Sequence, residues 1–135
     1  MKKRTLLFLC TGNSCRSQMA EGLANIKLNQ KFNISSAGVE AHGLNPRAVV
    51  IMDEIGIDIS HQESKSISDD DLLQYDFIIT LCGDAREKCP ILSNSNNNFH
   101  WDLQDPAKVR GDEKKIMDIY RKVRDQISEN INSLL

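Results

Sequence analysis

The chain alternates short apolar runs with longer stretches in which apolar residues recur every three or four positions. Continuous apolar runs at residues 5–9 and 77–81 predict strands that are covered on both faces. An alternating run at residues 32–36 predicts a short strand, and residues 99–103 predict an edge strand. Because helical patterns separate these strands, we expect a parallel sheet with helices on both faces.

Apolar residues at helical spacing predict three longer helices, and each has its own boundary signals. The first, over residues 17–29, carries a stripe of three: Met19, Leu23 and Ile26. The second starts with the capping pair Asn45 and Pro46, ends at Gly56 and carries Ala48, Met52 and Ile55. The final helix has the longest stripe: Ile116, Ile119, Val123, Ile127 and Ile131. A short helix should follow Ser68, because three aspartates after this cap suit a first turn.

The totals exclude several classes of protein. A length of 135 residues with no repeat or linker suits one domain over residues 1–135. The net charge is −2 and no dense basic tract is present, so a nucleic-acid partner is not expected. The apolar run after Arg4 stops at Thr11, too early for a secretory signal, and no stretch approaches a membrane span. We therefore expect a cytoplasmic protein with no membrane contact.

Three reactive side chains follow predicted strands. Cys10 ends the first strand, Cys82 comes directly after the run at residues 77–81, and Asp105 closely follows the edge strand. Ligands of open parallel sheets bind beyond the carboxyl ends of the strands. All three side chains should therefore lie at one rim of the sheet.

The turn between the first strand and the first helix has the composition of an anion cradle. It reads Cys10, Thr11, Gly12, Asn13, Ser14, Cys15, Arg16 and Ser17. Backbone N–H groups at a helix N-terminus bind anions, and an arginine can grip a tetrahedral oxyanion with two nitrogens. The same groups favour the thiolate form of Cys10, which would then face the bound anion as a nucleophile. A nucleotide loop is excluded because the Walker pattern is absent.

A second cysteine pair, Cys82 and Cys89, is separated by six residues. Zinc sites favour closer pairs, and the three histidines show no matching spacing, so we predict no metal site. In a helix the two Cα atoms would lie about 10.5 Å apart by rise alone. A disulfide needs Cα atoms within about 7 Å. If the two cysteines form a redox pair, the segment between them must therefore unwind.

Four segments resemble the thioredoxin-coupled arsenate reductases that share the low-molecular-weight protein tyrosine phosphatase fold. They are residues 10–22, 35–38, 42–46 and 80–84, of which the last reads Thr-Leu-Cys-Gly-Asp. The resemblance implies a three-layer α/β fold with a four-stranded parallel sheet flanked by helices. It also implies reduction of arsenate to arsenite, with thioredoxin as the electron donor and no tightly bound cofactor.

The same resemblance implies a role for each reactive residue. Cys10 attacks arsenate, which residues 11–17 bind, and Asp105 protonates the leaving oxygen. A Cys10–Cys82 disulfide forms first, and a Cys82–Cys89 disulfide replaces it and is reduced by thioredoxin. Phosphate or sulfate should mimic arsenate in the loop.

Three questions stay open at this level. Cys10, Arg16 and Asp105 would equally serve a low-molecular-weight tyrosine phosphatase, although Ala107 and Lys108 stand where such phosphatases usually carry tyrosines. A protein that binds an oxyanion or arsenite without turnover is a third possibility. Some resembling reductases hold potassium through residues matching Asn13, Glu21 and Ser36. Lys65 replaces an expected acidic residue, so we do not predict a dependence on potassium.

Overall fold

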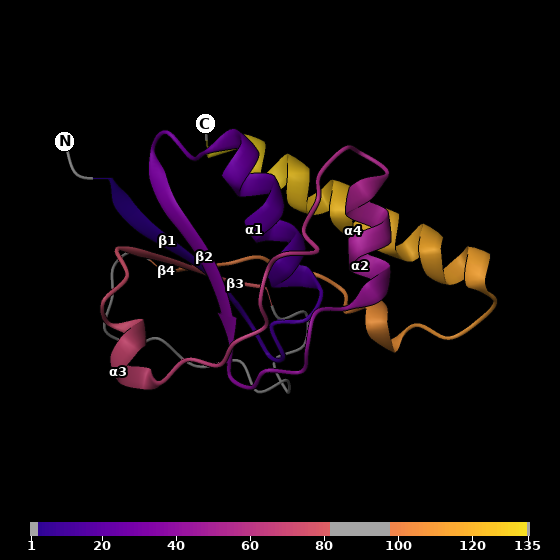
Figure 1. Cartoon of the computed structure of the whole chain (residues 1–135), viewed down its shortest axis with the longest axis horizontal. Helices are drawn as coiled ribbons and strands as arrows, with labels where there is room; N and C mark the ends of the chain where they lie inside the picture. Colours follow the sequence, from indigo (N-terminus) through magenta and orange to yellow (C-terminus); the bar gives the residue numbers. More distant parts are fainter. Residues whose placement is uncertain (1–2, 82–97, 135) are drawn as a thin grey trace.

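The computed structural model describes residues 3–81 and 98–134 and contains a parallel sheet with helices on both faces (Figure 1). The strands are β1 (Arg4–Cys10), β2 (Phe32–Gly38), β3 (Phe77–Thr80) and β4 (Asn98–His100). The helices are α1 (Arg16–Lys27), α2 (Pro46–Asp53), α3 (Asp69–Leu72), the 3₁₀ helix η1 (Pro106–Lys108) and α4 (Glu113–Asn132). The order in the sheet is β2-β1-β3-β4, and all pairs are parallel. The predicted α/β architecture with four parallel strands is confirmed.

The central strand β1 divides the apolar core into two layers because successive side chains point to opposite faces. Leu6 and Phe8 belong to the larger cluster, which includes residues of α1, α2 and α4. Leu7 and Leu9 belong to the smaller cluster, which includes Leu72 of α3. Figure 1 shows α1, α2 and α4 together on one face of the sheet and α3 on the other. This is the predicted three-layer arrangement.

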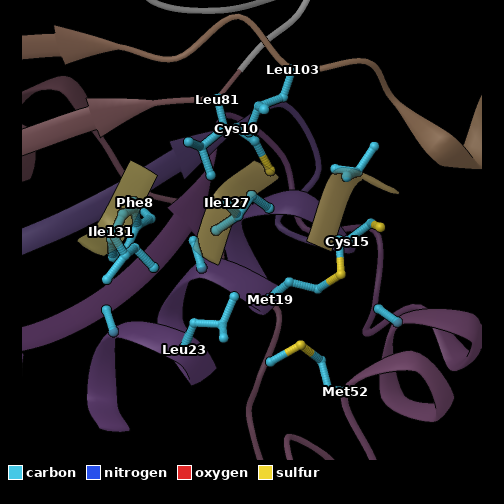
Figure 2. Close-up of a cluster of buried hydrophobic side chains, with 14 of the residues drawn as sticks. Phe8, Cys10, Cys15, Met19, Leu23, Met52, Leu81, Leu103, Ile127 and Ile131 are labelled. Carbon is cyan, nitrogen blue, oxygen red and sulfur yellow. The ribbon is translucent and has the colours of Figure 1, made fainter. Parts of the chain in front are cut away.

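The larger cluster reaches the carboxyl end of β1, where the reactive loop begins. Figure 2 shows Cys10 and Cys15 at this end of the cluster, with Leu81 and Leu103 near Cys10. Both cysteines are almost fully buried, and both are free thiols. The loop is therefore supported by packed apolar side chains, which hold its backbone in place.

The polar caps begin their helices as the sequence predicts. The Asn45 side chain accepts hydrogen bonds from the backbone N–H groups of Arg47 and Ala48, and Pro46 occupies the first turn of α2. Ser68 accepts one from Asp71 and caps α3. These bonds satisfy N–H groups that have no partner inside the helix.

Two apolar positions that the helical pattern assigns to the core are exposed instead. Ile26 is 63% exposed although it lies within the last turn of α1, and Leu28, just after the helix, is buried in the core instead. Ile55 is 44% exposed because α2 ends at Asp53, so Ile55 no longer follows the helical period. The edge strand is also shorter than expected, and it ends at His100.

None of the helices within residues 3–81 and 98–134 is long and apolar enough to cross a lipid bilayer.

Candidate active site

The loop between β1 and α1 is held from outside through its carbonyl groups. The N–H groups of Val39, Glu40 and His42 donate to the carbonyl oxygens of Cys10, Thr11 and Gly12, at 3.2, 2.9 and 2.9 Å. Further donors reach the next two carbonyls of the loop: Asn45 N reaches Ser14 and Gln18 Nε2 reaches Asn13. Because the N–H and C=O of a planar peptide point in opposite directions, these bonds turn the loop's N–H groups inward. The backbone therefore presents its donors as an anion cradle does.

Asn13 has the backbone conformation that closes the loop. Its φ angle is +46°, the one positive value at a non-glycine residue in the described part of the chain. This left-handed conformation costs an ordinary residue about 1 kcal/mol, and asparagine adopts it more readily than most. Asn13 is also fully buried, so its side chain must find partners within the protein.

A chain of side-chain hydrogen bonds runs from Asn13 to the Cys10 thiol and to a carboxylate. Asn13 Nδ2 donates to Ser17 Oγ at 2.8 Å and to Ser36 Oγ at 2.9 Å. Ser36 Oγ in turn donates to Glu21 Oε1 at 2.6 Å. Ser17 Oγ lies 2.8 Å from Cys10 Sγ. Since Ser17 already accepts from Asn13, its own hydroxyl hydrogen can point at the sulfur and donate a hydrogen bond to it.

The other end of the Asn13 amide is fixed by two donors. Its Oδ1 accepts from Gln18 Nε2 at 3.1 Å and from the backbone N–H of Lys65 at 2.8 Å. The side chain of Lys65 is exposed, so the contact with Asn13 is made by its backbone. In this arrangement the side-chain oxygens of Asn13 and Ser36 both have hydrogen-bond partners within the chain.

Arg16 and Asp105 bring the loop and the segment after β4 together. Arg16 Nη1 donates to the carbonyl oxygens of Leu81 and Leu103, each at 3.1 Å. Its Nη2 lies 3.6 Å from Asp105 Oδ2, and the two side chains are 4% and 19% exposed. Asp105 Oδ1 accepts from the N–H of Ala107 and caps η1, which fixes the carboxylate at the rim. The predicted convergence of the loop and Asp105 is therefore present.

These groups surround one cavity of about 420 Å³. Its lining comprises Cys10, Thr11, Gly12, Ser14, Cys15, Arg16, Glu40, His42, Asp105, Ala107 and Lys108. Within the described chain, the buried Oγ1 of Thr11 has no hydrogen-bond partner. A cavity lined by a thiol, a guanidinium and a carboxylate suits chemistry on a small anion.

Cys15 lies in the same loop, and its surroundings strongly shift the pKa of its thiol. Burial, followed by the negative charge of Asp105, raises the pKa of the Cys15 thiol far above its usual range. Its thiol is therefore protonated at neutral pH and a poor nucleophile.

Cys82 and Cys89 both lie outside the described residues. Within residues 3–81 and 98–134, no group of three or more His, Cys, Asp or Glu side chains is arranged to hold a metal ion.

Three residues that contact or line the site have no role predicted from the sequence. Gln18 anchors Asn13, while Glu40 and His42 line the cavity. A buried glutamine in the first turn of a helix is one usable signal for such a role. For His42 the signal comes only from the structure, in which the imidazole ring lies against Gly12.

Comparison with known proteins places this geometry in a family. The family described as low molecular weight phosphotyrosine protein phosphatase matches residues 5–135. The chain is 53% identical to an arsenate reductase of Bacillus licheniformis over 131 residues, which cover 97% of this chain and 94% of that relative.

Solved structures give the same neighbours. An arsenate reductase in its phosphate-binding state superposes with a TM-score of 0.82 at 35% identity, covering 97% of this chain and 95% of the other. A low molecular weight protein tyrosine phosphatase from T. tengcongensis superposes with a TM-score of 0.77 at 27% identity, covering 98% and 97%.

Proposed function

Since the chain belongs to the low molecular weight phosphotyrosine protein phosphatase family and closely resembles arsenate reductases, we propose that it reduces arsenate to arsenite. The observation that carries this proposal is the position of Cys10. Its sulfur lines a cavity bounded by an inward-facing backbone cradle and by Arg16 and Asp105. A solved relative, described as an arsenate reductase in its phosphate-binding state, supports a tetrahedral oxyanion as the ligand.

Binding comes first. The N–H groups of residues 11–17, together with the Arg16 guanidinium, hold the arsenate oxygens through charge-assisted hydrogen bonds. The arsenic atom then faces Cys10, whose thiolate form Ser17 favours through its hydroxyl. Phosphate and sulfate, which have the same tetrahedral shape, compete for this cradle.

The first chemical step forms a bond between sulfur and arsenic. The Cys10 thiolate attacks arsenic, and one arsenate oxygen leaves as water after it accepts a proton from Asp105. Arsenic stays in its higher oxidation state in this covalent ester. Asp105 is suited to this role because η1 holds its carboxylate at the cavity beside Arg16.

The next steps transfer electrons. Cys82 attacks the sulfur of Cys10, and the electron pair of the sulfur–arsenic bond passes to arsenic, which leaves as arsenite. The thiols of Cys10 and Cys82 are thereby oxidised to a disulfide. Cys89 then attacks Cys82 and releases Cys10 as a thiolate. These two cysteines lie outside the described residues, so this relay rests on the sequence and on the family.

The Cys82–Cys89 disulfide must be reduced before the next turnover, and thioredoxin is the donor we propose. A relay of this kind works where thiols are kept reduced, as they are in the cytoplasm. No tightly bound cofactor is required, because the electrons come from cysteine thiols and then from the partner protein.

Phosphatase activity is the second candidate, and the cavity supports it as a side reaction. Cys10, Arg16 and Asp105 are also the groups needed to cleave a phosphate ester. Ala107, however, contributes only a methyl group to the cavity rim. It offers little apolar surface to the ring of a phosphotyrosine, so we expect weak activity.

The experiment is arsenate turnover with thioredoxin, thioredoxin reductase and NADPH. The wild type should turn over repeatedly, whereas Cys82→Ser and Cys89→Ser should not. Cys15→Ala is the matched control, because its buried, protonated thiol has no part in the relay. Equal turnover by Cys89→Ser would contradict the relay. Arsenate binding without turnover in every variant would indicate a binding protein instead.

A further inference from the structure

A histidine and a glutamate stand at the mouth of the cavity, outside the loop that the mechanism uses. His42 and Glu40 both line the cavity, and both side chains are substantially exposed. Their backbone N–H groups bind the carbonyl oxygens of Gly12 and Thr11, so the segment is tied to the loop. The backbone that carries these two side chains is therefore held in a fixed relation to the anion cradle.

The contact between the two side chains fixes the orientation of the imidazole. His42 Nε2 lies 2.6 Å from Glu40 Oε2. An ionised carboxylate can only accept hydrogen bonds, so Nε2 must carry a hydrogen. In a neutral imidazole the other nitrogen, Nδ1, is then an acceptor with a free lone pair.

The edge of the ring that carries Nδ1 faces the loop. A Cβ atom built on Gly12 would collide with Nδ1 and Cγ of His42, so glycine is required there for the ring to lie so close. Among the described residues, Nδ1 has no hydrogen-bond partner. A hydrogen-bond acceptor thus lies beside the backbone N–H donors of the loop.

An acceptor at an anion site distinguishes anions that carry a proton from those that do not. Arsenate and phosphate keep one hydroxyl group in neutral and mildly alkaline solution, whereas sulfate keeps none. We propose that His42, oriented by Glu40, accepts a hydrogen bond from the hydroxyl of bound arsenate or phosphate and so selects them over sulfate. The inference rests on the proposed function, because it names the anion that the site selects.

Direct binding tests the inference without any thiol chemistry, so its failure is separate from a failure of arsenate reduction. Phosphate and sulfate are titrated calorimetrically into the full chain at mildly alkaline pH. Both anions are dianions there, so the charges of Arg16, Glu40, Asp105 and Lys108 act on them alike. The ratio of the two affinities is the readout.

His42→Phe removes the acceptor and keeps a ring beside Gly12. We expect phosphate binding to weaken about tenfold, the value of one hydrogen bond to a charged group. Sulfate binding should change by less than about twofold, since no bond to it is lost. His61→Phe, which replaces an exposed histidine away from the cavity, should leave both affinities unchanged.

Glu40→Gln provides a second test that keeps the size of the side chain. A glutamine amide can donate to Nε2, which moves the imidazole hydrogen to Nδ1 and turns the acceptor into a donor. The preference for phosphate over sulfate should then fall, even though loss of the Glu40 charge can strengthen the binding of both anions. An unchanged ratio of the phosphate and sulfate affinities in both variants would overturn the proposal. An equal loss of affinity for both anions in His42→Phe would overturn it as well.

Discussion

Arg16 Nη2 lies 3.6 Å from Asp105 Oδ2, across the cavity that also contains the Cys10 sulfur. The pair joins the start of α1 to the cap of η1, two places that are far apart in the sequence. A carboxyl group in this position can, in its protonated form, give its proton to an oxygen that leaves the anion. Its nearness to Arg16 also ties the geometry of the acid to that of the anion-binding residue.

Replacement of Asp105 by asparagine should separate proton donation from structure. The amide oxygen of Asn can still accept from Ala107 N–H and cap η1, but the side chain cannot donate a proton as an acid. We expect kcat for arsenate to fall about 100- to 10,000-fold, while phosphate binding persists. Steady-state kinetics and calorimetry measure the two effects, and a variant with wild-type kcat would exclude Asp105 as the acid.

Ser17→Ala removes the hydroxyl that points at Cys10. The Cys10 thiolate would lose one charge-assisted hydrogen bond, worth about 1.5–3 kcal/mol. The rate at which iodoacetamide alkylates Cys10 at neutral pH should fall about tenfold or more for this reason. Peptide mapping identifies the alkylated cysteine. Ser14→Ala is the matched control, because no side-chain hydrogen bond joins Ser14 to the sulfur in the described residues.

Gly38 is required by the close approach of backbone to backbone behind the loop. A Cβ there would lie 2.7 Å from Asn13 N and 2.8 Å from Thr11 O, and these backbone atoms cannot move aside cheaply. Gly38→Ala should therefore cost about 3 kcal/mol or more in the free energy of unfolding. A Cβ on Gly43 would meet no atom within 4 Å, so only the φ of +87° disfavours alanine there. Gly43→Ala should therefore cost about 1–2 kcal/mol in the free energy of unfolding. Urea denaturation compares them, and equal losses would contradict this packing.

The buried Cys15 thiol makes stability depend on alkaline pH. Its pKa is raised by burial in the folded chain, whereas in the unfolded chain it loses its proton near the ordinary value of about 8.5. Ionisation then favours the unfolded chain, so stability is full below this pH and falls above it, by up to about 1.4 kcal/mol per pH unit. Cys15→Ala should show a shallower decline in urea denaturation between neutral and alkaline pH. Parallel curves for the two proteins would show that Cys15 does not contribute.

Local sequence signals predicted most of the fold because the relevant forces are local. The caps at Asn45 and Ser68 act on the next few residues, and the runs in β1 and β3 are apolar because both faces are covered. Periodicity failed at Ile26 and Ile55 because each lies where a helix ends. It also gave no place to Tyr120, which is fully buried and whose hydroxyl accepts a hydrogen bond from Asn45.

In the site, too, some residues could be predicted from the sequence and others could not. Cys10 and Arg16 could be predicted because a strand, a turn and a helix N-terminus are consecutive in the sequence. The hydrogen bond from Ser36 to Glu21 joins β2 to α1, and no pattern within either element signals it. The contact of His42 with Gly12 likewise depends on how two loops pack together.

In the proposed relay three thiols react in turn at one oxyanion site, and disulfide mapping after a single turnover reveals the order of these exchanges. Reduced protein is mixed with arsenate without thioredoxin, quenched with acid and mapped by mass spectrometry. We expect a Cys82–Cys89 disulfide in the wild type and a Cys10–Cys82 disulfide in Cys89→Ser, each with one equivalent of arsenite. Arsenite formed with neither disulfide, or a wild-type disulfide that includes Cys15, would contradict it.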